Sequence, residues 1–268
     1  MTTGGKFAPR RLAALASVIL LAIAALSFMA IDRIPRLTPA ELTPEAVKDR
    51  LKRGEESLAG KNLQASLDIL LPLAAAGNAE AQYRAAVVYD KDASEALITG
   101  AGQLGTIEDN FHAATKWYEK AAAQGNLMAQ TNLGNHYCWG MGGARMGGVD
   151  AEKGMKWLMA AARQGVAPAM LSLGANYQQG ICTAASAQEA VKWYTAAAEH
   201  GDIWARHNLG IMYASGQGVA IDHVQAYIWF ELAGHDEDGE MREKLAPHER
   251  EEADRKIAAW RARFGGKP

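Results

Sequence analysis

Small and bulky apolar residues alternate along this chain in a pattern that returns four times. Tryptophan recurs at Trp117, Trp157, Trp193 and Trp229, so successive copies are 40, 36 and 36 residues apart. Alanine follows each tryptophan after four residues; in the first three copies glycine follows after eight, alanine after twelve, leucine after sixteen, glycine after seventeen and tyrosine after twenty. Most of these intervals are close to whole helical turns, so the pattern predicts paired, amphipathic α-helices. A degraded earlier copy runs through Ile69, Gly77, Ala81 and Tyr89.

Each copy is predicted to form helix A, which carries the tryptophan, then a tight turn and helix B, which carries the Leu-Gly pair. Residue types that favour helix N-caps stand seven residues before each tryptophan, namely Asn110, Asp150, Ser186 and Asp222. Ser186 and Glu189 also have the spacing of a capping box. The glycine eight residues after the tryptophan is predicted to end helix A in a left-handed conformation. Helix B is predicted to start at Asn126 and Asp202 in two copies, and to hold Pro168 in its first turn in another.

A glycine in the middle of helix B is the least expected feature of the pattern. It occurs as Gly134, Gly174 and Gly210, and costs about 1 kcal/mol relative to alanine each time. A chain that accepts this cost three times at one offset is predicted to bring two helices into close contact there. One helix pair cannot bury its apolar stripe alone, whereas stacked pairs can. The predicted fold class is therefore an all-α solenoid.

The copies resemble the repeats of a known family. They read "KWYEKAAAQGNLMAQTNLGNHYCWG", "KWLMAAARQGVAPAMLSLGANYQQG" and "KWYTAAAEHGDIWARHNLGIMYASGQGV". These stretches resemble Sel1-like repeats, which are helix-turn-helix units related to tetratricopeptide repeats but longer. The resemblance covers about residues 63–236, although the linkers after Tyr137 and Tyr177 and the segment 91–105 depart from it. It implies a scaffold or regulator that binds a protein or peptide partner in a groove, without a cofactor and without enzymatic activity.

The segments that flank the repeats are predicted to cap the array. Residues 44–62 are predicted to form an N-terminal capping helix that starts at Thr43-Pro44, and residues 237–268 are predicted to form C-terminal capping helices. The last of these opens at Pro247, ends near Phe264, and turns Ile257, Trp260 and Phe264 toward the array. A polar outer face is what the end of a solenoid requires.

The N-terminal part differs from the rest, because residues 12–31 contain no charged side chain. Twenty residues span ~30 Å as a helix, the thickness of a bilayer core. Lys6, Arg10 and Arg11 precede the run, which predicts that residues 1–11 are cytoplasmic and that residues 32–43 tether the repeats on the other side. The alternative is a signal peptide cleaved after Ala22-Ile23-Ala24, which would release a secreted factor. Together with the resemblance to Sel1-like repeats, an uncleaved anchor predicts a single-pass protein of the bacterial inner membrane. The repeats are then expected in the periplasm, and the partner is expected to be an envelope protein.

Composition and charge exclude some functions. Apolar residues make up 49% and charged residues 22% of the chain, and the net charge is −2. No basic stripe is visible, so nucleic acid is not a predicted partner. The histidines lack the spacing of metal ligands, and the glycine-rich residues 140–148 lack the lysine of a phosphate-binding loop. No catalytic, cofactor-binding or metal residue is therefore assigned. Some family members have been proposed to bind or hydrolyse β-lactams, so a cell-wall-acting or β-lactam-binding enzyme is the alternative function.

Two groups of residues remain as candidate sites. Cys138 and Cys182 lie near the ends of helix B in adjacent copies, and in an oxidising compartment they are predicted to form a disulfide rather than remain free thiols. Closing the loop between these two cysteines stabilises the fold by ~4 kcal/mol in the chain-entropy model. Polar and aromatic residues of helix B at positions that packing leaves free are the candidates for partner binding: Asn132, His136, Trp204 and Asn208.

Overall fold

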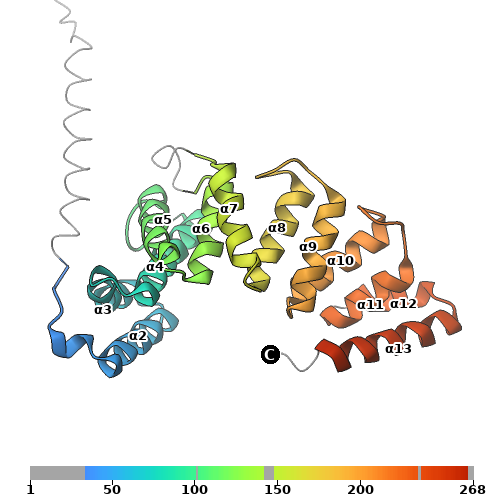
Figure 1. Ribbon diagram of the computed structural model, residues 1–268, viewed down its shortest axis with the longest axis horizontal. Coiled ribbons are helices and arrows are strands. Elements are labelled where there is room, and N and C mark those ends of the chain that lie inside the picture. The colour runs from blue at the N-terminus through green and yellow to red at the C-terminus, as the bar shows by residue number, and fades with distance from the viewer. Residues whose placement is uncertain (1–33, 101, 142–147, 235–236, 265–268) are drawn as a thin grey trace, which may run out of the picture.

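The described part of the chain is a curved stack of α-helices, without a strand. The computed structural model describes residues 34–100, 102–141, 148–234 and 237–264. Figure 1 shows the helices following an arc from α2 to α13. Helix A of successive copies corresponds to α3 (Leu63–Ala75), α5 (Ile107–Ala123), α7 (Ala151–Ala162), α9 (Ala187–Glu199) and α11 (His223–Ala233). Helix B corresponds to α4 (Ala79–Thr99), α6 (Leu127–Trp139), α8 (Ala167–Gln179) and α10 (Ile203–Ser215).

Most helix boundaries follow the predicted caps. The side chains of Asp150, Ser186 and Asp222 accept hydrogen bonds from backbone N–H groups three residues later, at 3.0, 3.3 and 2.9 Å. Asn126 and Asp202 cap α6 and α10 in the same way. The glycines that follow helix A are Gly125, Gly165 and Gly201, with φ of +88°, +84° and +96°. This left-handed backbone favours glycine over other residues.

Two predictions at helix starts are wrong. The cap of α5 is Thr106, whose hydroxyl accepts from Asp109 N at 3.1 Å, while Asn110 lies inside the helix. Asn110 is buried, and its amide donates to Asp92 Oδ2 at 2.7 Å. The capping box is also incomplete, because the Glu189 carboxylate pairs with Lys192 Nζ at 2.6 Å.

The extra residues between positions 91 and 105 extend α4. This helix has 21 residues, whereas the other three helices B have 13. Beyond Gly100 the chain returns to Asp92, whose carboxylate accepts from Gln103 N at 2.7 Å and Leu104 N at 3.0 Å. A buried carboxylate costs free energy unless it is hydrogen-bonded, and here three donors, counting Asn110, satisfy it. The insertion is thus an ordered part of the junction between α4 and α5.

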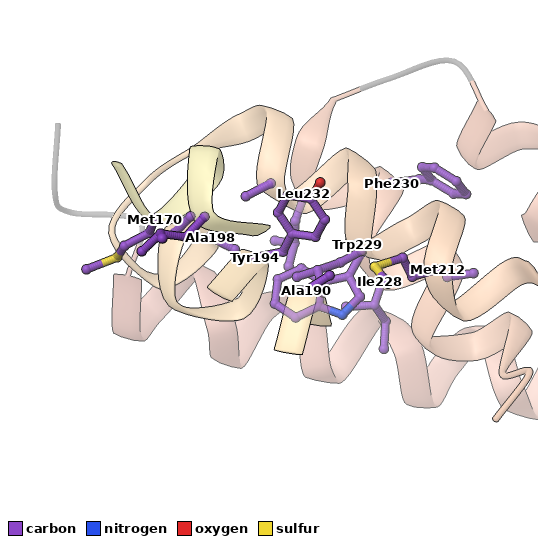
Figure 2. Close-up of a cluster of buried hydrophobic side chains, with 14 of the residues drawn as sticks. Met170, Ala190, Tyr194, Ala198, Met212, Ile228, Trp229, Phe230 and Leu232 are labelled. Carbon is purple, nitrogen blue, oxygen red and sulfur yellow. The ribbon is translucent and has the colours of Figure 1, made fainter. Parts of the chain in front are cut away.

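The close approach predicted at the mid-helix glycines is confirmed. A Cβ atom at Gly174 would lie 2.5 Å from Tyr194 Cδ1, and one at Gly210 would lie 2.6 Å from Phe230 Cδ1. At Gly134 the distance to Leu158 Cγ would be 2.7 Å. Each of these partners directly follows the tryptophan of the next helix A, so the residue after the tryptophan fills the glycine site. Figure 2 shows Tyr194, Trp229 and Phe230 in the buried cluster that results.

The same contact recurs at the N-terminal end of the array, where the sequence did not predict it. The helix α2 (Pro44–Ala59) places Gly54 so that its Cβ would lie 2.6 Å from Leu70 Cδ2. Leu70 directly follows Ile69, the counterpart of the tryptophan. The capping helix α2 therefore packs on α3 as a helix B packs on the next helix A. From α4 onward, packing is more extensive between helix B and the following helix A than within one A–B pair.

Helices flank the repeats at both ends of the described array. Thr43 caps α2 through Ala46 N at 3.4 Å, and α13 runs from Pro247 to Phe264 after the short helix α12 (Glu237–Lys244). Ile257 is buried, and Trp260 meets Trp229 edge-to-face with ring centroids 6.2 Å apart. The predicted membrane segment lies outside the described residues. Within the described ranges, no helix combines the length and apolar character needed to cross a bilayer.

Replacing Gly174 by valine tests the close approach directly. The added side chain would overlap the fully buried ring of Tyr194, so we expect the free energy of unfolding to fall by about 1–3 kcal/mol. The midpoint of thermal unfolding should fall by about 2–4 °C for each kcal/mol. The matched control is Ala175→Val on the adjacent residue of α8, where only the weaker helix propensity of valine, about 0.5 kcal/mol, should be felt. Equal losses in the two variants would contradict the contact.

Candidate binding surface

The helices B line the inner side of the curved array. In a curved stack, helices on the inside lie closer together than helices on the outside. Among the repeats, direct contacts between helices two apart in the chain include α6 with α8 and, at the N-terminal end, α2 with α4. These are helices B, together with the capping helix that acts as one; the contact of α11 with α13 belongs to the C-terminal cap, beyond the last helix B. We call the exposed side of α2, α4, α6, α8 and α10 the inner face.

Three positions on each helix B form this face, at eleven, fifteen and eighteen residues after the preceding tryptophan. On α6, α8 and α10 they are Met128, Asn132, Asn135, Pro168, Ser172, Ala175, Trp204, Asn208 and Ile211. None of these nine side chains is charged. Trp204 is 57% exposed, Met128 39% and Ile211 38%, which is unusual exposure for large apolar side chains. The inner face over these helices is thus neutral, with apolar anchors.

Three of the four candidates for partner binding share this face. Asn132 and Asn208 occupy the same offset on α6 and α10 and are half-buried, and Trp204 stands one turn before Asn208. The Asn132 amide donates to Tyr118 Oη at 2.9 Å, which fixes its orientation. The recurrence of these candidates at only two offsets was not recognised from the sequence.

The fourth candidate, His136, lies inside the protein with 4% of its surface exposed. The Thr115 hydroxyl donates to the Phe111 carbonyl at 2.8 Å and lies 2.8 Å from His136 Nδ1. Because the hydroxyl proton is already used, Nδ1 is the donor of that second bond. His136 Nε2 lies 3.3 Å from Asp90 Oδ1, an ion-pair distance without hydrogen-bond alignment. His136 therefore connects α4, α5 and α6 and is not part of the inner face.

The Tyr118 phenol completes this buried cluster. Its Oη donates to Asp90 Oδ2 at 3.1 Å and accepts from the Asn132 amide. Burial, followed by the charge of Asp90, raises the pKa of Tyr118 well above its usual range. The phenol consequently stays neutral and keeps Asn132 in place at physiological pH.

A pocket opens between α2 and α4 at the N-terminal end of the inner face. Its volume is about 190 Å³, and its lining combines apolar and charged side chains: Gly54, Glu55, Leu58, Leu70, Glu80, Tyr83, Arg84 and Val87. Glu80, Arg84 and Val87 stand at the eleven, fifteen and eighteen offsets of the degraded copy. The pocket therefore continues the same face that carries Asn132 and Trp204.

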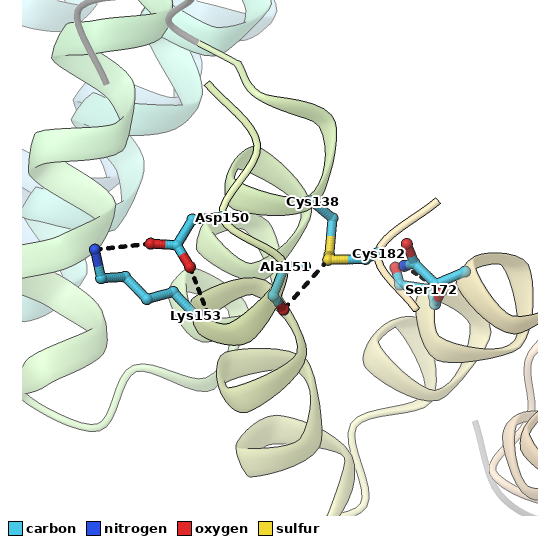
Figure 3. The surroundings of a disulfide bond; sticks show 7 residues. Cys138, Asp150, Ala151, Lys153, Ser172 and Cys182 are labelled. Carbon is cyan, nitrogen blue, oxygen red and sulfur yellow. Dashed lines mark hydrogen bonds and ion pairs between the residues drawn. A yellow bond between two sulfur atoms is a disulfide. The ribbon is translucent and has the colours of Figure 1, made fainter. Parts of the chain in front are cut away.

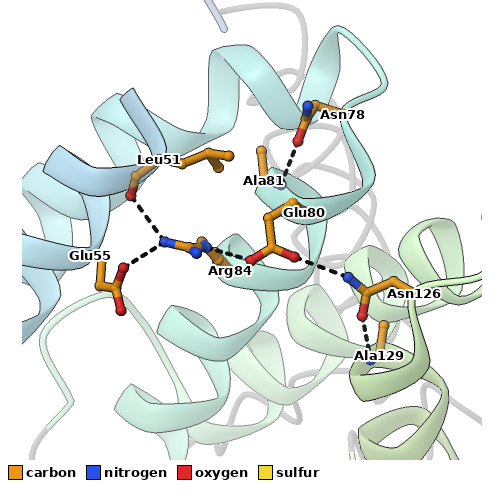
Figure 4. A network of polar contacts seen from close by, with 8 residues as sticks. All are labelled: Leu51, Glu55, Asn78, Glu80, Ala81, Arg84, Asn126 and Ala129. Carbon is orange, nitrogen blue, oxygen red and sulfur yellow. Dashed lines mark hydrogen bonds and ion pairs between the residues drawn. The ribbon is translucent and has the colours of Figure 1, made fainter. Parts of the chain in front are cut away.

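Arg84 organises the rim of this pocket (Figure 4). Its Nε donates to Glu80 Oε1 at 2.6 Å, and its Nη1 donates to Glu55 Oε2 at 2.9 Å and to the Leu51 carbonyl at 3.2 Å. Burial opposes the charge of Arg84, but the two carboxylates outweigh it and raise its pKa. Glu80 also accepts from the Asn126 amide at 3.2 Å, so one network joins α2, α4 and the start of α6.

A disulfide joins Cys138, near the end of α6, to Cys182 in the loop after α8 (Figure 3). The Sγ atoms are 2.16 Å apart and the Cα atoms 5.1 Å apart. Gly154 of α7 lies against the bridge, where a Cβ would be 2.5 Å from Cys138 Sγ and 2.9 Å from Cys182 Sγ. The other copies have alanine at this position, three residues before the tryptophan: Ala114, Ala190 and Ala226. This change from alanine to glycine was the sequence signal of the bridge, and it was missed.

Comparison with known proteins places the array in a family. The sequence profile described as Sel1 repeat matches residues 79–126, 127–166, 167–202 and 205–236, together more than half of the chain. The chain belongs to the Sel1 repeat family. Each match begins with a helix B and ends within or just after the next helix A, so the family unit coincides with the pair that packs most extensively. Sel1 repeat proteins are commonly scaffolds for protein–protein interaction and typically not enzymes.

Two solved structures resemble this Sel1 repeat protein. One is c5321, a protective antigen of uropathogenic Escherichia coli with an SLR fold, at 28% identity and a TM-score of 0.64. The match covers 82% of this chain and 47% of that antigen, so the chain spans about half of its length. The other is a Sel1 repeat protein from Oxalobacter formigenes, at 33% identity and a TM-score of 0.53, covering 72% of this chain and 70% of that one. Among curated proteins, none matches the chain.

Among the described residues, no three side chains of the types His, Cys, Asp or Glu come together in a way that could hold a metal ion.

Removing the disulfide tests its contribution to stability. The double variant Cys138→Ser/Cys182→Ser should lose ~4 kcal/mol of unfolding free energy, because the unfolded chain is no longer constrained by the loop. Chemical denaturation of the oxidised protein and of the variant measures this difference. Gly154→Ala should cost more in the oxidised protein than in the double variant, because in the oxidised protein the added Cβ would lie 2.5 Å from Cys138 Sγ and 2.9 Å from Cys182 Sγ. An equal cost in both backgrounds would contradict the role assigned to Gly154.

Proposed function

We propose that this Sel1 repeat protein is a scaffold or regulator that binds a protein or peptide partner along its inner face. The observation that carries the proposal is the neutral inner face of α6, α8 and α10, on which Met128, Trp204 and Ile211 are exposed. Interface cores are depleted of charge and enriched in aromatic residues and methionine. Aromatic side chains also carry much of the binding energy in such interfaces.

The half-buried amides add specificity to this surface. Asn132 and Asn208 recur at one offset, and each amide has two donor hydrogens and an acceptor oxygen, of which Asn132 uses one donor on Tyr118. Groups of this kind can pair with the backbone or side chains of a partner without a net charge. Asn132 is held in place by Tyr118, so little conformational entropy is lost when it binds.

We further propose that the repeats lie in the bacterial periplasm, attached to the inner membrane through residues 12–31, and that the partner is an envelope protein. The uncharged run of twenty residues with Lys6, Arg10 and Arg11 before it supports the anchor. The bridge between Cys138 and Cys182 supports an oxidising compartment, where disulfides persist.

Site-specific photo-crosslinking in the native cells tests this function. A photoreactive amino acid at Met128, Asn132 or Trp204 should capture the same protein partner from all three positions. The matched controls are Lys156 and Lys192, exposed residues of the helices A α7 and α9, which should capture nothing in common with the inner positions. Trp204→Ala should then weaken binding of the captured partner at least about five-fold, since truncated hot-spot residues typically cost more than ~1 kcal/mol.

Capture of the same partner from Lys156 and Lys192 would contradict the assignment of the inner face. The scaffold function itself would be contradicted if the full-length protein turned over cell-wall or β-lactam substrates and one point substitution abolished that turnover.

A further inference from the structure

The pocket between α2 and α4 is the charged end of an otherwise neutral inner face. At the offsets that are uncharged on α6, α8 and α10, α4 carries Glu80 and Arg84. Glu55 of α2 adds a second carboxylate across the pocket. Two carboxylates against one guanidinium leave one negative charge in excess, and the Arg84 charge is already engaged by both of them.

The carboxylates are held in position before any ligand binds. Glu80 accepts from Arg84 and from Asn126 through its two oxygens. The Glu55 side chain is 68% exposed and contacts Arg84 through Oε2, so its carboxylate is accessible from solvent. Preorganised charges of this kind lose little entropy on binding and favour a ligand of complementary sign.

The walls of the pocket suit an aliphatic stem. Leu58 and Leu70 line one side, and Val87 with the Tyr83 ring lines the other. A volume of about 190 Å³ is smaller than the ~300–1,000 Å³ of sites for drug-sized ligands, so one side chain is the appropriate occupant. Lysine and arginine bury an apolar stem and keep a charged head near polar groups. An aromatic ring adds a cation–π attraction to such a head group.

We propose that this pocket binds a lysine or arginine side chain of the partner. The inference rests on the proposed function and adds the feature that fixes the partner's register, since the inner positions of α6, α8 and α10 offer no charge to align it. An acidic side chain would be repelled by the two carboxylates. An apolar side chain would leave their excess negative charge without a partner.

The probes for the experiment are the N-acetyl amides of lysine, arginine, norleucine and glutamate, titrated into full-length protein with labelled leucine and valine methyl groups. The lysine and arginine amides should shift the methyl resonances of Leu58, Leu70 and Val87, with affinities at least about three-fold tighter than norleucine amide. Glu55→Gln should weaken the binding of lysine amide about two- to five-fold, the loss expected for an exposed ion pair. Glu55→Lys should abolish the methyl shifts that lysine amide causes. Glu251→Gln, an exposed glutamate of α13, is the matched control and should change nothing.

Norleucine amide binding as tightly as lysine amide would overturn the proposal, as would preferential binding of glutamate amide or the absence of any shift at these three residues. Such results would concern the pocket alone. If the crosslinks from Met128, Asn132 and Trp204 persisted, the scaffold function would stand, and if they also failed, both proposals would fall.

Discussion

Three of the four helices B dock on the next helix A because a glycine leaves room for the side chain that follows the tryptophan, whereas α4 has Ala86 at that offset. The contact is formed by Gly134 with Leu158, Gly174 with Tyr194 and Gly210 with Phe230, and it recurs between α2 and α3 at Gly54. A side chain in place of any of these glycines would push two helices apart. Since every unit rests on its neighbours, the whole stack and its curvature depend on this spacing.

The stacking also decides which residues are free to function. Positions that repeat are used by the core, and positions on helix B that point inward are left to vary. On α6, α8 and α10 these vary among amides, small residues and exposed apolar residues, whereas on α4 they carry charge. The disulfide ties α6 to the loop after α8 across α7. The inner face is therefore held on rigid, connected elements.

Much of the fold could be predicted because one signal was repeated. Caps, turn glycines and close contacts each returned at fixed offsets, and the structure agrees with most of them. Asn110 was misassigned because the insertion in α4 supplies a buried partner, Asp92, that no periodicity reveals. Gly54 was missed because no helix A with a tryptophan precedes α2, and because the linker from α2 to α3 is shorter than the linkers between the later copies. The pocket could not be predicted, since its α2 residues lie outside the repeat pattern and no offset relates them to α4. The burial of His136 depends on three helices at once.

The contact between Gly210 and Phe230 is the most direct measure of the central constraint, because the three atoms nearest to a methyl group at Gly210 would all belong to that ring. A double-mutant cycle of Gly210→Ala and Phe230→Ala, followed by chemical denaturation, gives the coupling free energy between the two positions. The glycine contact predicts that Gly210→Ala destabilises the protein when Phe230 is present and becomes neutral or stabilising when it is absent, with a coupling of about 1 kcal/mol or more. Strictly additive effects would show that the two helices do not meet there, and would contradict the account.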